Sequence, residues 1–181
     1  MSLLTAPQLY GGLASALVWL RVGLGGAEAL AALLLSHTAL PLAPILFDAA
    51  RGEVDIFVSE RGRRWKYYLL SLLAYALGLA YATWRGYRLY AALTLSYAAT
   101  AAALAAVTVL CRWKVSAHTA GIAGPTTALV LVVGREAAAL YLLLAPVAWA
   151  RLELGAHTPA QLAAGAAIAV ASTLAALSAP L

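Results

Sequence analysis

Long apolar runs separated by short turns rich in glycine and charge dominate the sequence. The runs cover residues 9–22, 27–50, 67–84, 89–111, 121–133, 137–150 and 159–177. A helix needs about 20 apolar residues to cross the hydrocarbon core of a membrane, and four of the runs approach or exceed that length. The run 9–22 is marginal and could instead lie in the membrane interface, while 121–133 and 137–150 are short for complete spans. The pattern predicts an all-α, polytopic membrane helix bundle with about six transmembrane helices.

Two local features refine this prediction. Pro41 and Pro44 fall inside the run 27–50, so we expect that helix to be kinked. Thr158 directly precedes Pro159, which is typical of a helix N-cap followed by proline at the first helical position. The last helix is therefore expected to begin at Pro159.

The composition agrees with a membrane protein. Hydrophobic residues make up 64% of the 181 residues and charged residues only 10%, whereas soluble domains have about 45–50% and 25%. The mean hydropathy is +0.87. A chain of this length leaves no room for a second domain, so we expect a single membrane domain over residues 1–181, multi-pass in the cell membrane. The single cysteine, Cys111, excludes an intrachain disulfide and a thiolate metal cage.

The number of crossings predicts where the charges gather. Two successive helical hairpins, turning at 85–88 and 134–136, return the chain twice to the side on which residues 51–66 lie. Three segments, 51–66, 112–120 and 151–158, should therefore share one face of the bundle. That face holds His118 and His157 and eight of the 12 basic residues: Arg51, Arg61, Arg63, Arg64, Lys66, Arg112, Lys114 and Arg151.

The net charge of +5 has two readings. Basic loops orient membrane proteins with the positive side in the cytoplasm, and this explanation requires no ligand. The two histidines favour a site for an anion, because imidazole is the usual acid, base or nucleophile near neutral pH. Nucleic acid is not expected as a partner of a chain this apolar.

The spacing of residues on this face suits phosphate chemistry. Lys114, Ser116 and His118 place a cation, a hydroxyl and an imidazole within five residues at the start of a helix. Arg151 precedes His157 at the next return to the face. Arginine binds phosphate oxygens with two parallel hydrogen bonds, and a helix N-terminus attracts anions. A neutral imidazole can attack phosphorus, and a protonated one can supply a proton to the leaving oxygen.

The segments WKVSAHTAG (113–121) and ARLELGAHTPAQLAAG (150–165) resemble the second and third signature motifs of the type-2 phosphatidic acid phosphatase superfamily. These motifs read Pro-Ser-Gly-His and Ser-Arg-(five residues)-His-(three residues)-Asp. The resemblance, to the integral membrane branch of a superfamily that includes the vanadium-dependent haloperoxidases, covers about residues 37–178. It implies that His157 is the nucleophile and His118 the general acid, that Arg151 and Ser116 bind phosphate, and that no metal or other cofactor is needed.

The chain departs from the family pattern at several positions. Gln161 stands where the family has the aspartate that orients the nucleophile; its carbonyl can accept the imidazole N–H but cannot stabilise an imidazolium as a carboxylate would. The first motif, lysine then six residues then Arg-Pro, has no strict match, because Phe57 occupies the position seven residues before Arg64. We expect Arg64 and Arg61 to bind phosphate there, with Lys114 as the substitute cation.

The resemblance predicts an integral membrane phosphatase that hydrolyses a lipid phosphate or diphosphate through a phosphohistidine, with an isoprenyl (di)phosphate as the favoured substrate. Lipid substrate and membrane lipids are the partners it implies; the oligomeric state stays open. Two alternatives remain: a phosphotransferase that passes the phosphoryl group to a second substrate, and a non-catalytic protein that binds anionic lipid. The side of the membrane is also open, because removing the four expected basic phosphate ligands leaves four basic residues against three on the opposite face.

Overall fold

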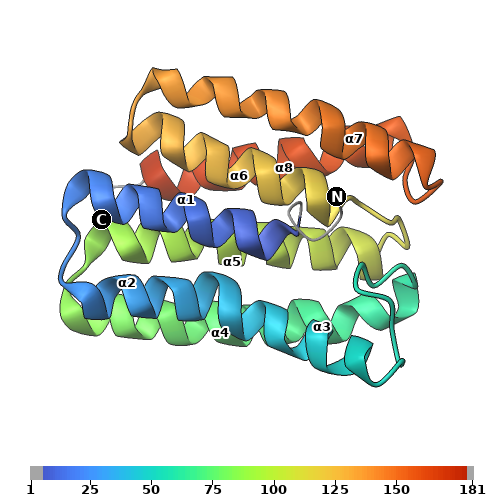
Figure 1. The fold of residues 1–181 in the computed structure, drawn as a ribbon, viewed down its shortest axis with the longest axis horizontal. Helices are drawn as coiled ribbons and strands as arrows, with labels where there is room; N and C mark the ends of the chain where they lie inside the picture. The colour runs from blue at the N-terminus through green and yellow to red at the C-terminus, as the bar shows by residue number, and fades with distance from the viewer. Residues whose placement is uncertain (1–5, 179–181) are drawn as a thin grey trace.

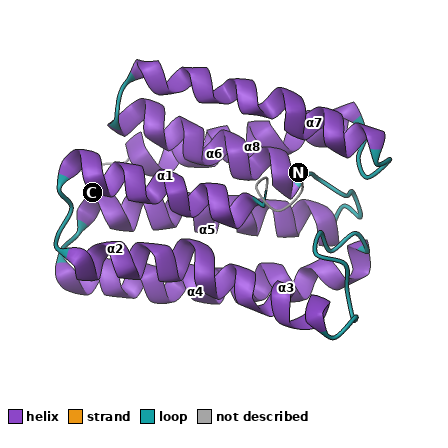
Figure 2. Cartoon of the chain, in the orientation of Figure 1, coloured by secondary structure: helices purple, strands orange, loops and turns teal. Residues whose placement is uncertain are grey.

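The computed structural model describes residues 6–178, and within them every regular element is a helix, as the apolar pattern predicted. Residues 1–5 and 179–181 of the predicted domain lie outside the described residues. The helices run side by side along one long axis (Figure 1), joined by short loops at both ends (Figure 2). In chain order the elements are α1 (Pro7–Val22), α2 (Ala27–Leu34), η1 (Leu35–Ala39), α3 (Leu40–Ala50), η2 (Arg61–Arg63), α4 (Arg64–Arg85), α5 (Arg88–Val109), α6 (Ala117–Val132), η3 (Arg135–Leu143), α7 (Leu144–Glu153) and α8 (Pro159–Ser178).

Four helical segments are long and apolar enough to cross a membrane. They are Ala27–Ala50, Arg61–Arg85, Arg88–Val109 and Pro159–Ser178. Large apolar side chains such as Leu20, Leu77 and Leu142 project outward and are more than half exposed. A soluble monomer rarely exposes apolar surface so widely, whereas a lipid-facing surface requires it. The architecture is consistent with a membrane protein.

The helix Ala27–Ala50 is irregular one turn before the expected kink. The chain continues as helix through Pro41 and Pro44, and the preceding residues Leu35–Ala39 form a π-helical turn in which the Leu40 N–H donates to the Leu35 carbonyl. Proline has no N–H, so Pro41 cannot satisfy the carbonyl four residues earlier, and the wider π turn precedes it.

The short run predicted at 137–150 spans the bundle because its first part is a 3₁₀-helix. The element η3 has nine residues, and it continues directly into the ten residues of α7. A 3₁₀-helix rises about 2.0 Å per residue instead of 1.5 Å, so η3 and α7 together reach about 33 Å. This length matches a hydrocarbon core of about 30 Å.

The helix α1 lies inside the bundle rather than across its end. It runs beside α6, where the Tyr10 and Thr126 hydroxyls are 2.8 Å apart, and the Tyr97 hydroxyl of α5 donates to the Gly11 carbonyl over 2.9 Å. His37 of η1 is fully buried and bonds Ser15 of α1 through Nδ1 at 2.8 Å. The run 9–22 is thus a helix that packs along the bundle, and its position in the membrane interface stays a prediction.

Candidate functional site

The three segments predicted to share a face meet at one end of the bundle. The Arg64 guanidinium donates to the Val115 carbonyl over 3.4 Å and thereby joins the start of α4 to the loop before α6. The Ser116 N–H donates to the Gln161 carbonyl over 3.2 Å, which joins that loop to α8. Figure 1 shows the connections after α3, α5 and α7 at the same end of the molecule. The prediction from the number of crossings is confirmed.

The loop after α3 is shaped by Asp55. Its carboxylate accepts hydrogen bonds from the N–H groups of Phe57 and Ser59, both over 2.8 Å, and Val58 takes a left-handed φ of 47°. The Arg64 Nε then donates to the Val58 carbonyl over 2.9 Å. These bonds hold the Phe57 ring over the end of the bundle.

The N-terminus of α6 presents Ser116 and His118. Ser116 is the N-cap, and its Oγ accepts from the Thr119 N–H over 3.3 Å, which leaves its hydroxyl proton available for a ligand. The helix lies so close to α8 that a Cβ added to Gly165 would collide with the Ser116 carbonyl. A glycine at 165 therefore fixes the position of this helix end.

The orientation of His157 is set by backbone and side-chain acceptors. Its Nδ1 lies 3.2 Å from the Lys114 carbonyl oxygen and 3.3 Å from the Gln161 Oε1. A carbonyl oxygen can only accept, so Nδ1 carries the proton and the lone pair is on Nε2. Gln161 itself is fixed by a capping box, in which its Oε1 accepts from the Thr158 N–H at 3.1 Å and its N–H donates to the Thr158 hydroxyl at 3.4 Å.

Burial and the neighbouring positive charges keep the ring of His157 neutral. Burial, reinforced by the positive charges of Arg64 and Lys114, lowers the pKa of His157 to about 4. Its hydrogen bond to Gln161 acts in the opposite direction but is weaker. At neutral pH the imidazole therefore has a free lone pair on Nε2, as a nucleophile requires.

Three cations of the site form no salt bridge with an acidic side chain in the described chain. Arg64, Lys114 and Arg151 take part in none of the ion pairs within residues 6–178, whereas the neighbouring Lys66 lies 2.6 Å from Asp48. Burial, followed by the charge of Arg64, lowers the pKa of Lys114. Asp55 acts electrostatically on Lys114 and Arg151 without forming a salt bridge with either. Positive charge concentrated in this way, most of it buried, favours the binding of an anion.

Arg151 is held by an aromatic ring instead of a carboxylate. Its side chain is 4% exposed, and its guanidinium carbon lies 4.5 Å from the centre of the Phe57 ring. The same ring lies 5.8 Å from that of His118. Stacking on an aromatic face positions a guanidinium and leaves its N–H donors free for an anion. In the described chain no group forms a hydrogen bond with this guanidinium.

Most of the residues predicted for the site are brought together. His118, Arg64 and Arg151 are buried at this end of the bundle, and both arginines act electrostatically on the His118 ring. Arg61 differs: it is exposed and donates to the Arg112 carbonyl, so it lies at the rim of the site. Phe57 was not among the site residues predicted from the sequence. Its position, which is that of the lysine in the first family motif, was the signal that could have identified it.

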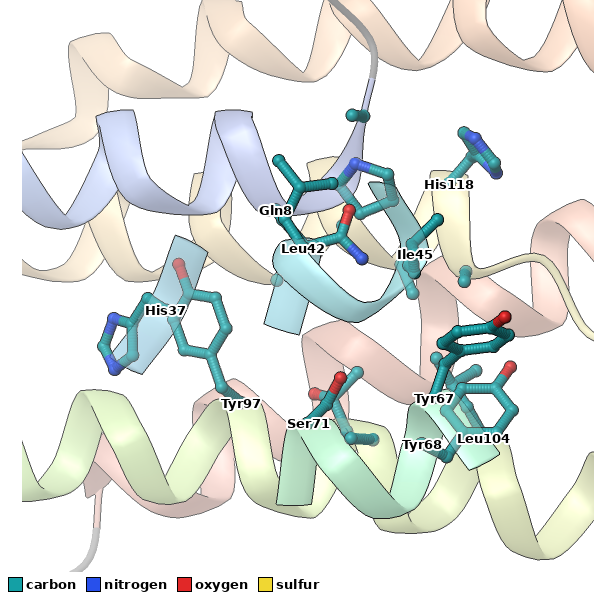
Figure 3. A pocket seen from close by; sticks show the side chains of 18 of the residues that line it. Gln8, His37, Leu42, Ile45, Tyr67, Tyr68, Ser71, Tyr97, Leu104 and His118 are labelled. Carbon is teal, nitrogen blue, oxygen red and sulfur yellow. The ribbon is translucent and has the colours of Figure 1, made fainter. Parts of the chain in front are cut away.

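An internal cavity of about 160 Å3 begins beside His118 (Figure 3). It runs between the helices toward His37 and Tyr97. No group of three or more His, Cys, Asp and Glu side chains in the described chain is placed to hold a metal ion. The chemistry available comes from two imidazoles, three unpaired cations, a serine hydroxyl and a helix N-terminus. Together these groups suit a phosphate or another compact oxyanion.

No protein-family model, characterised protein or solved structure matches this chain significantly.

Proposed function

We propose that this protein is an integral membrane phosphatase that hydrolyses a lipid phosphate or diphosphate through a phosphohistidine. One observation carries the proposal. The imidazole of His157 is neutral with its lone pair on Nε2, and it lies at a cluster of three cations that form no salt bridge with a described acidic side chain. A nucleophile beside a cluster of cations that can bind an anion is what phosphoryl transfer requires.

The residues have distinct tasks in the proposed reaction. The phosphate lies against Arg151, Arg64, Lys114 and the Ser116 hydroxyl, and Nε2 of His157 attacks phosphorus. The bond between phosphorus and the leaving oxygen breaks, and the protonated His118 gives its proton to that oxygen, which belongs to the lipid alcohol or, for a diphosphate, to the lipid monophosphate. The negative charge of the bound phosphate favours this protonated form of His118.

The second step restores the enzyme. Water gives a proton to the now neutral His118 and attacks the phosphohistidine, so that the bond between phosphorus and Nε2 breaks. Inorganic phosphate leaves, and His157 is again neutral. The products are a lipid alcohol, or a lipid monophosphate from a diphosphate, and phosphate.

The proposal includes six membrane crossings. These are α2–α3, α4, α5, α6, η3–α7 and α8. The helix α1 begins beside α6 one turn inside the bundle, where a Cβ on Gly121 would collide with Pro7. In this arrangement the lipid tail and the site are reached from within the membrane, and the membrane is the location of the protein.

The test is phosphate release by detergent-purified protein from phosphatidic acid, an isoprenyl phosphate and an isoprenyl diphosphate, with EDTA present. We expect release by the wild type and a loss of at least about 1,000-fold in His157→Ala, because the nucleophile is absent. Arg63→Ala is the control: Arg63 is a basic residue on the same face, paired with Glu60 at 2.9 Å, and its loss should leave the rate unchanged.

Other outcomes separate the alternatives. Transfer of labelled phosphate to an alcohol, without free phosphate, would identify a phosphotransferase. Binding of anionic lipid without turnover, or equal rates in wild type and His157→Ala, would exclude the phosphohistidine mechanism and leave a lipid-binding protein. An acid-labile phosphoprotein formed by the wild type and absent in His157→Ala would identify the intermediate.

A further inference from the structure

The internal cavity lies on the side of the site where the leaving group must be. Its walls come from α1, η1, α3, α4, α5, α6 and α8 and from the loop after α3, and at the site end it is lined by His118, Phe57 and Arg64. His157 does not line it. In the proposed reaction His118 gives a proton to the leaving lipid oxygen, so the lipid portion that follows the phosphate occupies this cavity.

One face of α4 forms a wall of the cavity. Arg64, Tyr68, Ser71 and Tyr75 all line it, and their spacing of four, three and four residues places them on one side of the helix. The wall extends about 16 Å from the phosphate site into the bundle. It ends where Gly78 packs against Ser36 so closely that a Cβ would lie 2.7 Å from the Ser36 Cβ.

Three hydroxyls on this wall, those of Tyr68, Ser71 and Tyr75, form what we call the hydroxyl row. The Tyr68 hydroxyl is buried without a hydrogen-bond partner in the described chain, and neither Ser71 nor Tyr75 forms a hydrogen bond with any described residue. The opposite wall differs, because Thr100 and Tyr97 of α5 donate to backbone carbonyls over 2.8 and 2.9 Å. Of the three hydroxyls only that of Tyr68 is fully buried, and Ser71 is partly buried. Side chains with three unbonded hydroxyls on one wall of a mostly apolar cavity suit a ligand with polar atoms.

We propose that the hydroxyl row binds neutral oxygen atoms of the leaving lipid, and that it selects lipids with ester or hydroxyl oxygens close to the phosphate. The inference rests on the proposed function. Arg64, at the mouth, is the only Asp, Glu, Lys or Arg among the described residues that line the cavity. The row therefore faces an uncharged part of the ligand. Tyr68 and Ser71 lie about one and two helical turns from Arg64, within reach of the first groups beyond a phosphate.

The chemistry of the row separates two classes of lipid phosphate. A glycerol ester phosphate has carbonyl oxygens that accept from the row, whereas an isoprenyl chain is pure hydrocarbon and would leave all three hydroxyls unpaired. Burying a donor without an acceptor reduces affinity. The row therefore favours a glycerol ester phosphate, in contrast to the isoprenyl substrate that the sequence resemblance favoured.

The test compares kcat/KM for phosphatidic acid and for geranylgeranyl phosphate in the same detergent. The wild type should prefer phosphatidic acid. Each of Tyr68→Phe, Ser71→Ala and Tyr75→Phe should lower kcat/KM for phosphatidic acid roughly 3- to 10-fold and leave geranylgeranyl phosphate within about twofold. Tyr81→Phe is the matched control, because Tyr81 is on the same helix and its hydroxyl is also buried and unpaired, but it does not line the cavity.

A binding measurement tests the row without any turnover. Diacylglycerol should bind the purified protein more tightly than geranylgeraniol, and the triple variant should lose that difference. Equal losses with both substrates, an unchanged preference in the triple variant, or tighter binding of geranylgeraniol would overturn the proposal. Absence of phosphate release from every lipid, with diacylglycerol binding still dependent on the row, would overturn the proposed phosphatase and retain the lipid selectivity.

Discussion

At the scale of single residues, Gln161 shows how an amide takes over part of a carboxylate's task. Its Oε1 accepts from both the Thr158 N–H and the His157 Nδ1, so one side chain caps α8 and fixes the imidazole tautomer. The Lys114 carbonyl is a second acceptor for the same nitrogen. Orientation of the proposed nucleophile thus needs no carboxylate, and only electrostatic stabilisation of an imidazolium is lost.

This leads to a prediction about pH. In Gln161→Glu a carboxylate would replace the amide beside Nδ1 and favour the protonated imidazole, so the pKa of His157 should rise from about 4 by about 1–3 units. The acidic limb of kcat/KM for phosphate release should shift upward by the same amount, because only the neutral ring attacks. Thr158→Ala breaks the same capping box without adding charge and should leave the limb in place. An unshifted limb in Gln161→Glu would show that it does not report His157.

Phe57 is a second case of substitution by a different kind of interaction. It stands where the resembled family has a lysine, and its ring supports Arg151 from below at 4.5 Å. Phe57 therefore contributes to the proposed phosphate site by positioning Arg151, whereas a lysine would contribute its own charge. Lys114, on the neighbouring loop, provides the additional cation.

At the scale of elements, the contact between α6 and α8 decides where the N-terminus of α6 lies. Gly165 allows α8 to reach the Ser116 carbonyl, and the Thr119 hydroxyl donates to the Leu162 carbonyl over 2.8 Å across the same contact. Small residues at helix interfaces permit such close approach in membrane proteins. The position of the proposed phosphate-binding end of α6 therefore depends on a residue that has no side chain.

We accordingly predict that Gly165→Ala destabilises the protein by about 1–3 kcal/mol and lowers phosphate release further than this loss of stability explains. The added methyl group would displace the Ser116 backbone. Gly124→Ala is the matched control in the same interface, since its Cβ would meet the Ala169 Cβ at 3.3 Å and requires only a small adjustment. Thermal unfolding in detergent and the rate per folded molecule are the two measurements. Equal behaviour of the two variants would contradict the prediction.

At the scale of the whole molecule, the bundle buries polar groups within an otherwise apolar core and exposes apolar groups on its outer surface. Buried Ser15, His37 and Thr94 bond one another across α1, η1 and α5, while leucines cover the exterior. Hydrogen bonds across helices add to packing where the surrounding lipid is as apolar as the side chains. The basic site lies at one end of the bundle and the turn containing Arg135 at the other.

If the bundle spans a membrane, residues at its two ends should be exposed on opposite sides of that membrane. Cys111 is an exposed free thiol at the site end, and the side chain of Arg135 is 95% exposed at the other end. In intact cells, a membrane-impermeant maleimide should label either wild-type Cys111 or Arg135→Cys in a Cys111→Ser background, and not both. Permeabilised cells should show labelling of both. Labelling of both thiols from outside intact cells would contradict a bundle that spans the membrane, and the labelled one identifies the side on which the site opens.

The helices, their turns and the convergence of three loops could be predicted from the sequence alone. Apolar runs of nearly membrane length leave few other structures for a backbone that must satisfy its own hydrogen bonds in lipid. The number of crossings then placed residues 51–66, 112–120 and 151–158 on one face. Thr158 before Pro159 located the start of α8. These conclusions depend on local pattern and parity, which a sequence contains directly.

Only the tertiary structure decided what those residues face. The partnership of Phe57 and Arg151 joins positions 94 residues apart in the chain, and the proton on Nδ1 of His157 depends on the Lys114 carbonyl of another loop. The π turn before Pro41 and the 3₁₀ stretch of η3 depend on packing and on the length of the bundle. A short segment of sequence does not contain that information. The cavity arises from six α-helices, η1 and the loop after α3 together, because a void is a property of the space between elements and not of any one of them.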